Sequence, residues 1–234
     1  MKVQAGTLMP DSTDVPLYLS ETYWWAYLHP RAIHLFERQW LVNLILWGNF
    51  GPLRDEALAA LGLEQQGRTL QVACVYGDLT AKLLERTAPG SSLDVIDVLP
   101  LQLANLERKL PARSGANLIR CNSAAMDFAA GSYDRALVFF LLHEQPEDVR
   151  RNTIAQTLRV VRPGGRIVIV DYHRPSPLNP LFLPMTGILH TLEPFALDLW
   201  RREITDWFPP DAKVADVQKT TSFGGLYQKL IITV

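Results

Sequence analysis

Short apolar runs that alternate with helical stretches between residues 69 and 175 constrain the fold more than any other feature of this chain. The runs are TLQVACVY, SLDVIDV, ANLIRCN, SYDRALVFFLL and RIVIVDY, and helical patterns cover residues 78–86, 100–110 and 146–161 between them. The runs lack a clean apolar–polar alternation, which is typical of parallel strands that are buried on both faces. The pattern predicts a doubly wound α/β fold with a mostly parallel sheet between two layers of helices.

Helical segments are expected on both sides of this core. Residues 1–66 predict an irregular arm and an N-terminal helical cap, in which Pro30 starts or kinks a helix. Residues 67–175 form the α/β core, and residues 176–211 predict an inserted helical segment. Residues 212–234 predict two strands that complete the sheet as an antiparallel edge. Arg150, Arg151 and Arg159 are interpreted as the solvated face of the helix at 146–161.

The tryptophans are placed unevenly along the chain. All six, at positions 24, 25, 40, 47, 200 and 207, lie outside residues 69–175. Flat amphipathic side chains on helices beside the sheet predict a lid over a flat or apolar ligand bound at the edge of the sheet. Plain helix packing explains them equally well.

Composition limits the class of protein. The 234 residues carry 23 Lys and Arg against 24 Asp and Glu, a net charge of -1, so a nucleic-acid partner held by a general basic field is not expected. Cys74 and Cys121 are the only cysteines, too few for a disulfide framework. The N-terminal residues lack a secretory pattern and no apolar stretch is long enough to span a bilayer, so we expect a cytoplasmic protein.

The first strand–turn–helix, LQVACVYGDLT, predicts the ligand site. In open α/β sheets, ligands bind beyond the carboxyl ends of the strands. Gly77 is the one glycine of this turn, Asp78 stands at or near the helix N-cap, and Asp97 ends the next strand 20 residues after Gly77. An acidic side chain at that place suits the two hydroxyls of a ribose. The spacing predicts a nucleotide-type site.

Several segments together resemble a known superfamily. TLQVACVYGDLT, VIDVLPLQLANLERKL, RCNSAAMDF, SYDRALVFFLLHEQP and VRPGGRIVIVDYHRP are similar in order and spacing to class I S-adenosylmethionine-dependent methyltransferases, above all those that act on quinone rings. The resemblance implies a seven-stranded Rossmann-like sheet. It also implies the cofactor contacts: Asp97 on the ribose, Val98 beside the adenine, Asn122 and Ser123 near the adenine amino group, and Phe139 with Phe140 facing the sulfonium and the substrate.

The first turn departs from the pattern of that superfamily. Its members usually have an acidic residue at the position of Gln71 and glycines at the positions of Ala73 and Val75, whereas only Gly77 remains here. Val75 places a branched side chain where a bare backbone normally meets the methionine part of the cofactor. We therefore expect Val75, Gly77 and Asp78 to hold the methionyl end of the cofactor in a different position.

A narrower resemblance spans nearly the whole chain from Tyr18. YWWAYLHPRAIHLFERQWLVNLILWGNF, VACVYGDLT, FFLLHEQPEDVRRNT, VIVDYHRP, LEPFALDLW and FGGLYQKL are similar to the rhodoquinone-biosynthesis enzymes. The resemblance implies conversion of ubiquinone to rhodoquinone, in which an amino group replaces a ring methoxy group. It further implies S-adenosylmethionine as the source of the amino group and Mn²⁺ as a supporting ion. Because a prenylated quinone resides in the bilayer, we expect peripheral contact with the inner membrane.

Polar residues near the ends of the strands are the candidates for this chemistry. Tyr76, His143, Asp171 and His173 are the predicted catalytic residues. Asp78, His143, Glu144, Asp171 and His173 are the candidate metal ligands, because oxygen and imidazole ligands suit manganese. Plainer roles stay open, among them helix capping by Asp78 and packing of Tyr76 on Val75.

Two other functions remain compatible with these residues. One is an ordinary O- or C-methyltransferase that acts on a quinone precursor. The other is an inactive methyltransferase-like subunit that only presents a quinone to a partner, which the missing acid at Gln71 and the missing glycine at Val75 make conceivable.

Overall fold

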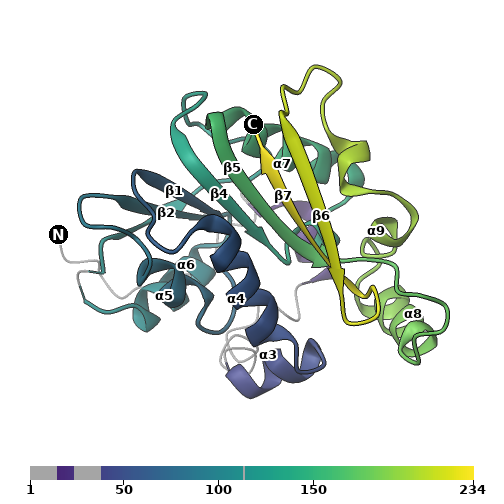
Figure 1. The fold of residues 1–234 in the computed structure, drawn as a ribbon. Coiled ribbons are helices and arrows are strands. Elements are labelled where there is room, and N and C mark those ends of the chain that lie inside the picture. Colours follow the sequence, from purple (N-terminus) through teal and green to yellow (C-terminus); the bar gives the residue numbers. More distant parts are fainter. Residues whose placement is uncertain (1–14, 24–37, 113) are drawn as a thin grey trace.

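The computed structural model describes residues 15–23, 38–112 and 114–234 (Figure 1). Seven strands form one sheet in the order β3-β2-β1-β4-β5-β7-β6. They are β1 (Arg68–Val72), β2 (Ser92–Asp97), β3 (Ala116–Arg120), β4 (Tyr133–Phe139), β5 (Val161–Tyr172), β6 (Asp216–Ser222) and β7 (Tyr227–Thr233). β1 to β5 pair in parallel, and β7 pairs antiparallel with β5 and β6. The predicted doubly wound fold with an antiparallel edge is confirmed.

Helices cover both faces of this sheet. They are α1 (Leu17–Thr22), α3 (Gln39–Ile45), α4 (Phe50–Leu61), α5 (Leu79–Leu84), α6 (Pro100–Lys109), α7 (Glu147–Val160), α8 (Phe182–Leu192) and α9 (Asp198–Arg201), with the 3₁₀ turns η2 (Leu142–Glu144) and η3 (Ile204–Trp207). Figure 1 shows α4 in front of the sheet and α7 behind it. The N-terminal helices and the helices inserted between β5 and β6 are present as the sequence predicted.

Several element boundaries differ from the predicted ones, and those of β1 and β5 have a clear cause. β1 ends at Val72, although the apolar run continues to Tyr76, because Ala73 adopts a left-handed backbone with φ 73° and turns the chain out of the strand. β5 begins at Val161 and so contains the Arg-Pro-Gly-Gly segment that was expected to precede it. Val161 pairs with Tyr133 across a register irregularity, and this pairing holds the segment in the sheet.

The strand order explains where a ligand can enter. β1 pairs with β2 on one side and with β4 on the other, so the order of the sheet reverses between β1 and β4. Val72 is paired with both Ile96 and Val138, which brings the carboxyl ends of the three strands to one edge. This is the switch point at which open α/β sheets bind ligands.

The tryptophans divide into two groups. Trp200 and Trp207 are buried in the main core, whereas Trp40 and Trp47 are 58% and 40% exposed. Trp24, Trp25 and Pro30 lie outside the described residues. Within the described ranges, each helix is too short or too polar to cross a bilayer.

Candidate active site

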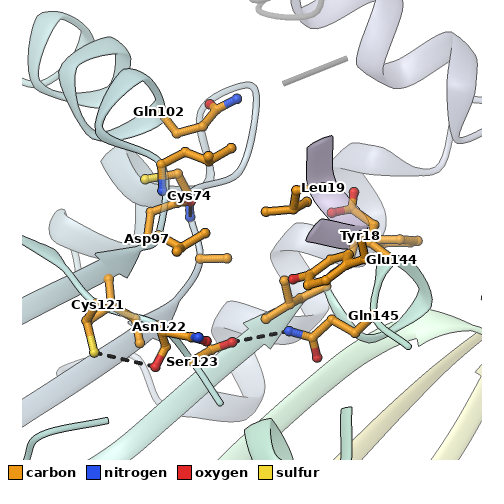
Figure 2. Close-up of a pocket in the computed structure, with 16 residues that line it drawn as sticks. Tyr18, Leu19, Cys74, Asp97, Gln102, Cys121, Asn122, Ser123, Glu144 and Gln145 are labelled. Atoms are coloured by element: carbon orange, nitrogen blue, oxygen red, sulfur yellow. Dashed lines mark hydrogen bonds between the residues drawn. The ribbon is translucent and has the colours of Figure 1, made fainter. Parts of the chain in front are cut away.

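A cavity lies at the carboxyl ends of β1, β2, β3 and β4, between the strand ends and helix α1 (Figure 2). Figure 2 shows Asp97, Cys74 and Gln102 on one side of this cavity, and Tyr18, Glu144 and Gln145 on the other. The residues that line it are Tyr18, Leu19, Ala73, Cys74, Ile96, Asp97, Val98, Leu99, Gln102, Cys121, Asn122, Ser123, Phe140, Leu141, Glu144 and Gln145. We refer to the side with Asp97, Asn122 and Ser123 as the strand-end wall and to the side with Glu144 as the charged wall.

Asp97 is the central carboxylate of the strand-end wall. Its Oδ1 accepts the backbone N–H of Leu99 at 2.8 Å, and its Oδ2 accepts the backbone N–H of Cys74 at 2.9 Å. Burial raises the pKa of Asp97 to about 6, although these N–H donors act in the opposite direction. Each oxygen keeps a further lone pair, so Asp97 can still accept hydrogen bonds from two hydroxyl groups of a ligand.

Asn122 and Ser123 complete the strand-end wall beyond β3. The Asn122 Oδ1 accepts the backbone N–H of Ala124 at 2.9 Å, which fixes the start of the loop. The Ser123 hydroxyl lies 2.9 Å from that of Thr153 and accepts the amide N–H of Gln145 at 3.1 Å. Gln145 therefore connects the two walls across the cavity floor (Figure 2).

The β1–α5 turn supports this wall from behind. The Gln71 amide donates to the carbonyl of Ala73 at 3.0 Å and accepts the Thr80 hydroxyl at 3.0 Å. Ala73 lines the cavity in its left-handed conformation, a backbone geometry that costs about 1–2 kcal/mol without glycine. Gln71 stabilises this strained turn from inside the protein.

Other side chains contact the second half of the β1–α5 turn, around Gly77 and Asp78. Gly77 has φ 84°, and a Cβ atom there would lie 3.0 Å from the Phe50 ring. Lys109 donates to the carbonyl oxygen of Gly77 at 2.9 Å. Asp78 occupies the N-cap position without a side-chain capping bond and accepts two hydrogen bonds from Arg54, at 2.6 and 2.7 Å. Val75, Gly77 and Asp78 are not among the residues that line the cavity, and their predicted contact with the cofactor stays a prediction.

The charged wall follows β4 directly. Phe139 is buried and packs edge-on against Phe50 with ring centroids 6.1 Å apart, whereas Phe140, at φ 50°, turns toward the cavity. The turn η2 then carries His143 and Glu144. The His143 Nδ1 lies 2.9 Å from Asp171 Oδ1, and its Nε2 lies 3.8 Å from Glu144 Oε1. The sequence predicted His143 and Asp171 for the site, and the structure brings them into contact.

The charge on His143 follows from its neighbours. Burial alone lowers the pKa of an imidazole, but the negative charges of Asp171, Glu193 and Glu144 outweigh it and raise the pKa of His143 to about 9. The ring is therefore an imidazolium at neutral pH. It lies edge-on to Tyr172, with ring centroids 4.9 Å apart.

Arg150 holds the charged wall in place, and its assignment to a solvated helix face was wrong. The side chain is 0% exposed and donates to the carbonyl oxygens of Leu142, Gln145 and Phe195, each at 2.8 Å. Its guanidinium also lies 4.5 Å from the centre of the Trp207 ring. The buried face of α7 carries Thr153, Ile154, Thr157 and Leu158 at helical spacing from Arg150, a signal that could have revealed its burial.

Two predicted catalytic residues, Tyr76 and His173, are not among the residues that line this cavity. The Tyr76 hydroxyl accepts the amide N–H of Gln102 at 2.8 Å, and Tyr76 is not among the residues that line the cavity. His173 bonds through Nδ1 to the carbonyl of Gly225 at 2.8 Å and lines a separate hollow beside α9. Neither observation tests their catalytic role directly. The polar side chains of the cavity that the sequence did not single out are Tyr18, Gln102 and Gln145.

The candidate metal ligands do not form a common site. Asp78 is paired with Arg54, His173 lies at the separate hollow, and Asp171 bonds to His143. Within residues 15–23, 38–112 and 114–234, no three His, Cys, Asp or Glu side chains are arranged to hold a metal ion. The described donors therefore do not fit Mn²⁺, and no chemical step is assigned to it.

The family match agrees with this geometry. Residues 69–165 match the family described as "Methyltransferase domain". These residues are similar to that domain. Human N-acetylserotonin methyltransferase in complex with S-adenosylmethionine has the same fold, with a TM-score of 0.61 and 13% identity over 95% of this chain and 61% of that one. The predicted class I methyltransferase fold is confirmed.

Curated relatives match over a larger part of the chain. An uncharacterised methyltransferase of Synechocystis is 26% identical over 164 residues, which cover 70% of this chain and 72% of the relative. A demethylmenaquinone methyltransferase of Geobacillus is 24% identical over 153 residues, which cover 62% of this chain and 64% of the relative. The chain is thus related to methyltransferases, including one that is named for a quinone.

Proposed function

We propose that this protein is an S-adenosylmethionine-dependent enzyme that converts ubiquinone to rhodoquinone by replacing a ring methoxy group with an amino group. The observation that carries the proposal is a β1–α5 turn that departs from the usual glycine-containing pattern, beside a strand-end wall whose polar groups suit an adenosine. Asp97, Asn122 and Ser123 supply polar groups suited to a ribose and an adenine. The turn that would meet the methionine part instead has Gln71 and the strained Ala73.

The charge of residue 71 matters for the chemistry of an amino group. A carboxylate beside the methionyl amine would keep that amine protonated, and an ammonium ion has no lone pair with which to attack a quinone. Gln71 is neutral, 1% exposed and bonded within the turn. A neutral turn favours the free amine, which is the form that amino replacement requires. When bound, the cofactor supplies either an electrophilic methyl group or this amino nitrogen.

A lipid quinone suits the surroundings of the charged wall. Phe140, Tyr172 and Tyr227 form an aromatic cluster with ring centroids 5.3 to 5.8 Å apart, and Phe140 reaches the cavity. Flat apolar side chains of this kind stack with a quinone ring. The demethylmenaquinone methyltransferase relative also acts, by its name, on a quinone.

Contact with the surface of the inner membrane is part of the same proposal. Helices α3 and α8 contain no Lys, Arg, Asp or Glu and expose Trp40, Leu44, Leu183, Ile188 and Leu192. The Trp47 indole N–H donates to the Met185 sulfur at 3.2 Å and so connects the segment after α3 to α8. Flotation with phospholipid vesicles should carry the protein upward. A Leu183→Glu, Leu192→Glu variant should stay at the bottom, and a wild-type protein that stays there would contradict the membrane contact.

Ordinary methylation of a quinone precursor is the second candidate. The match to a methyltransferase domain and the names of both relatives favour it. It requires only that the ring carbon or oxygen of the substrate approaches the methyl group in line.

Isotope transfer separates the candidates. The protein is incubated, with and without Mn²⁺, with ubiquinone or a demethylated precursor and with S-adenosylmethionine labelled by ¹⁵N in the amino group and ¹³C in the methyl group. We expect ¹⁵N in the quinone product by mass spectrometry. Label from ¹³C alone would establish methylation and overturn amino replacement. No label and no cofactor binding by calorimetry would indicate an inactive quinone-presenting subunit.

A further inference from the structure

Three ionisable side chains follow one another from the cavity into the core. The Glu144 side chain is 13% exposed and belongs to the charged wall of the cavity. Behind it, the His143 Nε2 lies 3.8 Å from Glu144 Oε1, and on its other side Nδ1 lies 2.9 Å from Asp171 Oδ1. Only Glu144 of the three lines the cavity, so it is the member that a bound substrate can reach.

The inner end of this series is fixed by backbone contacts. Asp171 is 0% exposed, and its Oδ2 accepts the backbone N–H groups of Leu142 at 2.8 Å and His143 at 3.3 Å. Its Oδ1 accepts the backbone N–H of Tyr172 at 2.8 Å in addition to the imidazole. Asp171 can therefore neither rotate nor withdraw without breaking several hydrogen bonds, and it sets the orientation of the His143 ring.

Several other ionisable groups surround His143 and Glu144. Glu193, one residue beyond α8, adds negative charge near His143, and burial raises the pKa of Glu193 while the imidazolium opposes that rise. Tyr18, Tyr23 and Tyr172 stay neutral, because burial raises the pKa of each, with a smaller contribution from the negative charge of Glu144. The imidazolium is thus the cation that faces the cavity carboxylate from inside the protein.

We propose that Glu144 is the proton acceptor of the reaction, and that His143 and Asp171 are positioning residues that hold its carboxylate toward the substrate. This inference rests on the proposed function, because it needs a transfer reaction in this cavity. It assigns a catalytic role to Glu144, which the sequence analysis names as a candidate metal ligand.

The proton movement is balanced in either candidate reaction. In amino replacement, the incoming nitrogen forms a bond to the ring carbon, and one of its N–H bonds breaks with the electron pair staying on nitrogen. Glu144 takes that proton and then delivers it to the methoxy oxygen, whose bond to the ring carbon breaks so that it leaves as methanol. To leave a free amino group on the ring, the bond from this nitrogen to the cofactor carbon must then break by elimination, in which the nitrogen keeps the electron pair and gains the proton that the adjacent cofactor carbon loses. Neither step needs an oxidant or a reductant. In methylation, Glu144 takes the proton that the ring carbon or oxygen loses when it gains the methyl group. General base catalysis of this kind contributes about 10²–10⁴-fold.

The first test replaces the carboxylate with its neutral isostere. Glu144→Gln should lower kcat by about 10²-fold or more with KM for the quinone nearly unchanged. Glu64→Gln, an exposed glutamate away from the cavity, serves as the matched control and should behave like the wild type. A Glu144→Gln variant that keeps wild-type kcat would overturn the inference.

The second test measures the positioning residues without turnover. In the ligand-free protein, the imidazole NMR signals of His143 should titrate at about pH 9, and Glu144→Gln should lower that pKa. Above this pH the neutral Nε2 no longer attracts the carboxylate, so wild-type kcat should fall as pH rises through about 9. His143→Gln should lower kcat and remove this alkaline limb. An unchanged His143 pKa in Glu144→Gln would show that the two groups are not coupled and would contradict the proposal.

Calorimetry separates failure of this inference from failure of the proposed function. Wild type and Glu144→Gln should both bind S-adenosylmethionine with similar affinity, because Glu144 lies across the cavity from Asp97. If the wild type does not bind S-adenosylmethionine, the proposed function is contradicted. If the wild type binds the cofactor and turns over, and Glu144→Gln turns over equally fast, only the role of Glu144 is contradicted.

Discussion

The two walls of the cavity are built in opposite ways. The strand-end wall consists of residues at adjacent strand ends, and Asp97 is fixed by the backbone N–H groups of Leu99, two residues on, and of Cys74, just beyond the end of the paired strand β1. The charged wall depends on contacts between segments far apart in the chain, such as His143 with Asp171 and Arg150 with Phe195. The comparison teaches that binding groups can be set where paired strands of the sheet end, whereas the proposed proton-transfer group also needs contacts from α7 and from the segment after α8.

If the charged wall depends on distant contacts, its central residue should have the largest effect on stability. Arg150→Met leaves the carbonyls of Leu142, Gln145 and Phe195 without their donor, and we expect a loss of about 3 kcal/mol or more in the free energy of unfolding. Chemical denaturation followed by circular dichroism measures it. The neighbouring Arg151→Met is the control and should cost less than about 0.5 kcal/mol, because its partner Glu147 is exposed. Equal losses in both variants would contradict this difference between the walls.

The next largest effect is expected at the inner carboxylate of the same wall. Asp171→Asn keeps the shape of the side chain but removes the charge that faces the buried imidazolium. We expect a loss of about 2 kcal/mol in stability at pH 7 and a fall in the pKa of His143 from about 9. NMR titration of the imidazole tests the second effect, with exposed Asp211→Asn as the control. A His143 pKa that stays at about 9 would show that Asp171 does not set the charge of this wall.

At the strand-end wall, the expected effect is on binding and depends on pH. Burial raises the pKa of Asp97 to about 6, so its carboxylate gains a proton as the pH falls through that value and loses a hydrogen-bond acceptor. The Kd for S-adenosylmethionine should therefore rise by up to about tenfold between pH 7.5 and pH 5. Asp97→Asn should bind about tenfold more weakly than wild type at pH 7.5 and lose most of this pH dependence. Calorimetry at several pH values tests both, and an equally steep dependence in Asp97→Asn would exclude Asp97 as its source.

The smallest effect is expected at the strained turn between β1 and α5. Ala73→Gly removes the steric cost of φ 73°, but glycine also gains freedom in the unfolded chain. The two effects oppose each other, and we expect a net stabilisation of about 0.5 kcal/mol, measured by thermal unfolding. A destabilised variant would mean that the methyl group of Ala73 packs favourably and that the turn is not strained.

The fold could be predicted because its signal is local and repeated. Apolar strands without alternation, separated by helical stretches, specify a parallel sheet, and the spacing from Gly77 to Asp97 places a polar group at the switch point. The end of β1 could not be predicted, because TLQVACVY stays apolar to Tyr76 and the sequence carries no sign that Ala73 takes a left-handed backbone. That conformation is imposed by Gln71 and Thr80 from inside the fold.

The charged wall could be predicted only in part. The sequence predicts His143 and Asp171 for the site because they lie near the ends of strands, but nothing in the sequence says that they are in contact. The assignment of Arg150 to the solvated face is wrong because arginine is usually exposed, whereas this side chain bonds to carbonyl groups of the loop before α7 and of the distant Phe195 and packs on Trp207. Tyr76 and His173 also follow strands; Tyr76 bonds to Gln102 of the cavity, and His173 lies at a separate hollow. Their predicted catalytic roles stay predictions.

A crystal structure of the protein with S-adenosylhomocysteine tests the central claim most directly. We predict that the adenosine lies at the strand-end wall, with the ribose hydroxyls 2.6–3.2 Å from the Asp97 carboxylate and the sulfur between Ala73 and Glu144. An adenosine bound elsewhere, or a ribose with no contact to Asp97, would contradict the proposed cofactor site and, with it, the roles assigned to both walls.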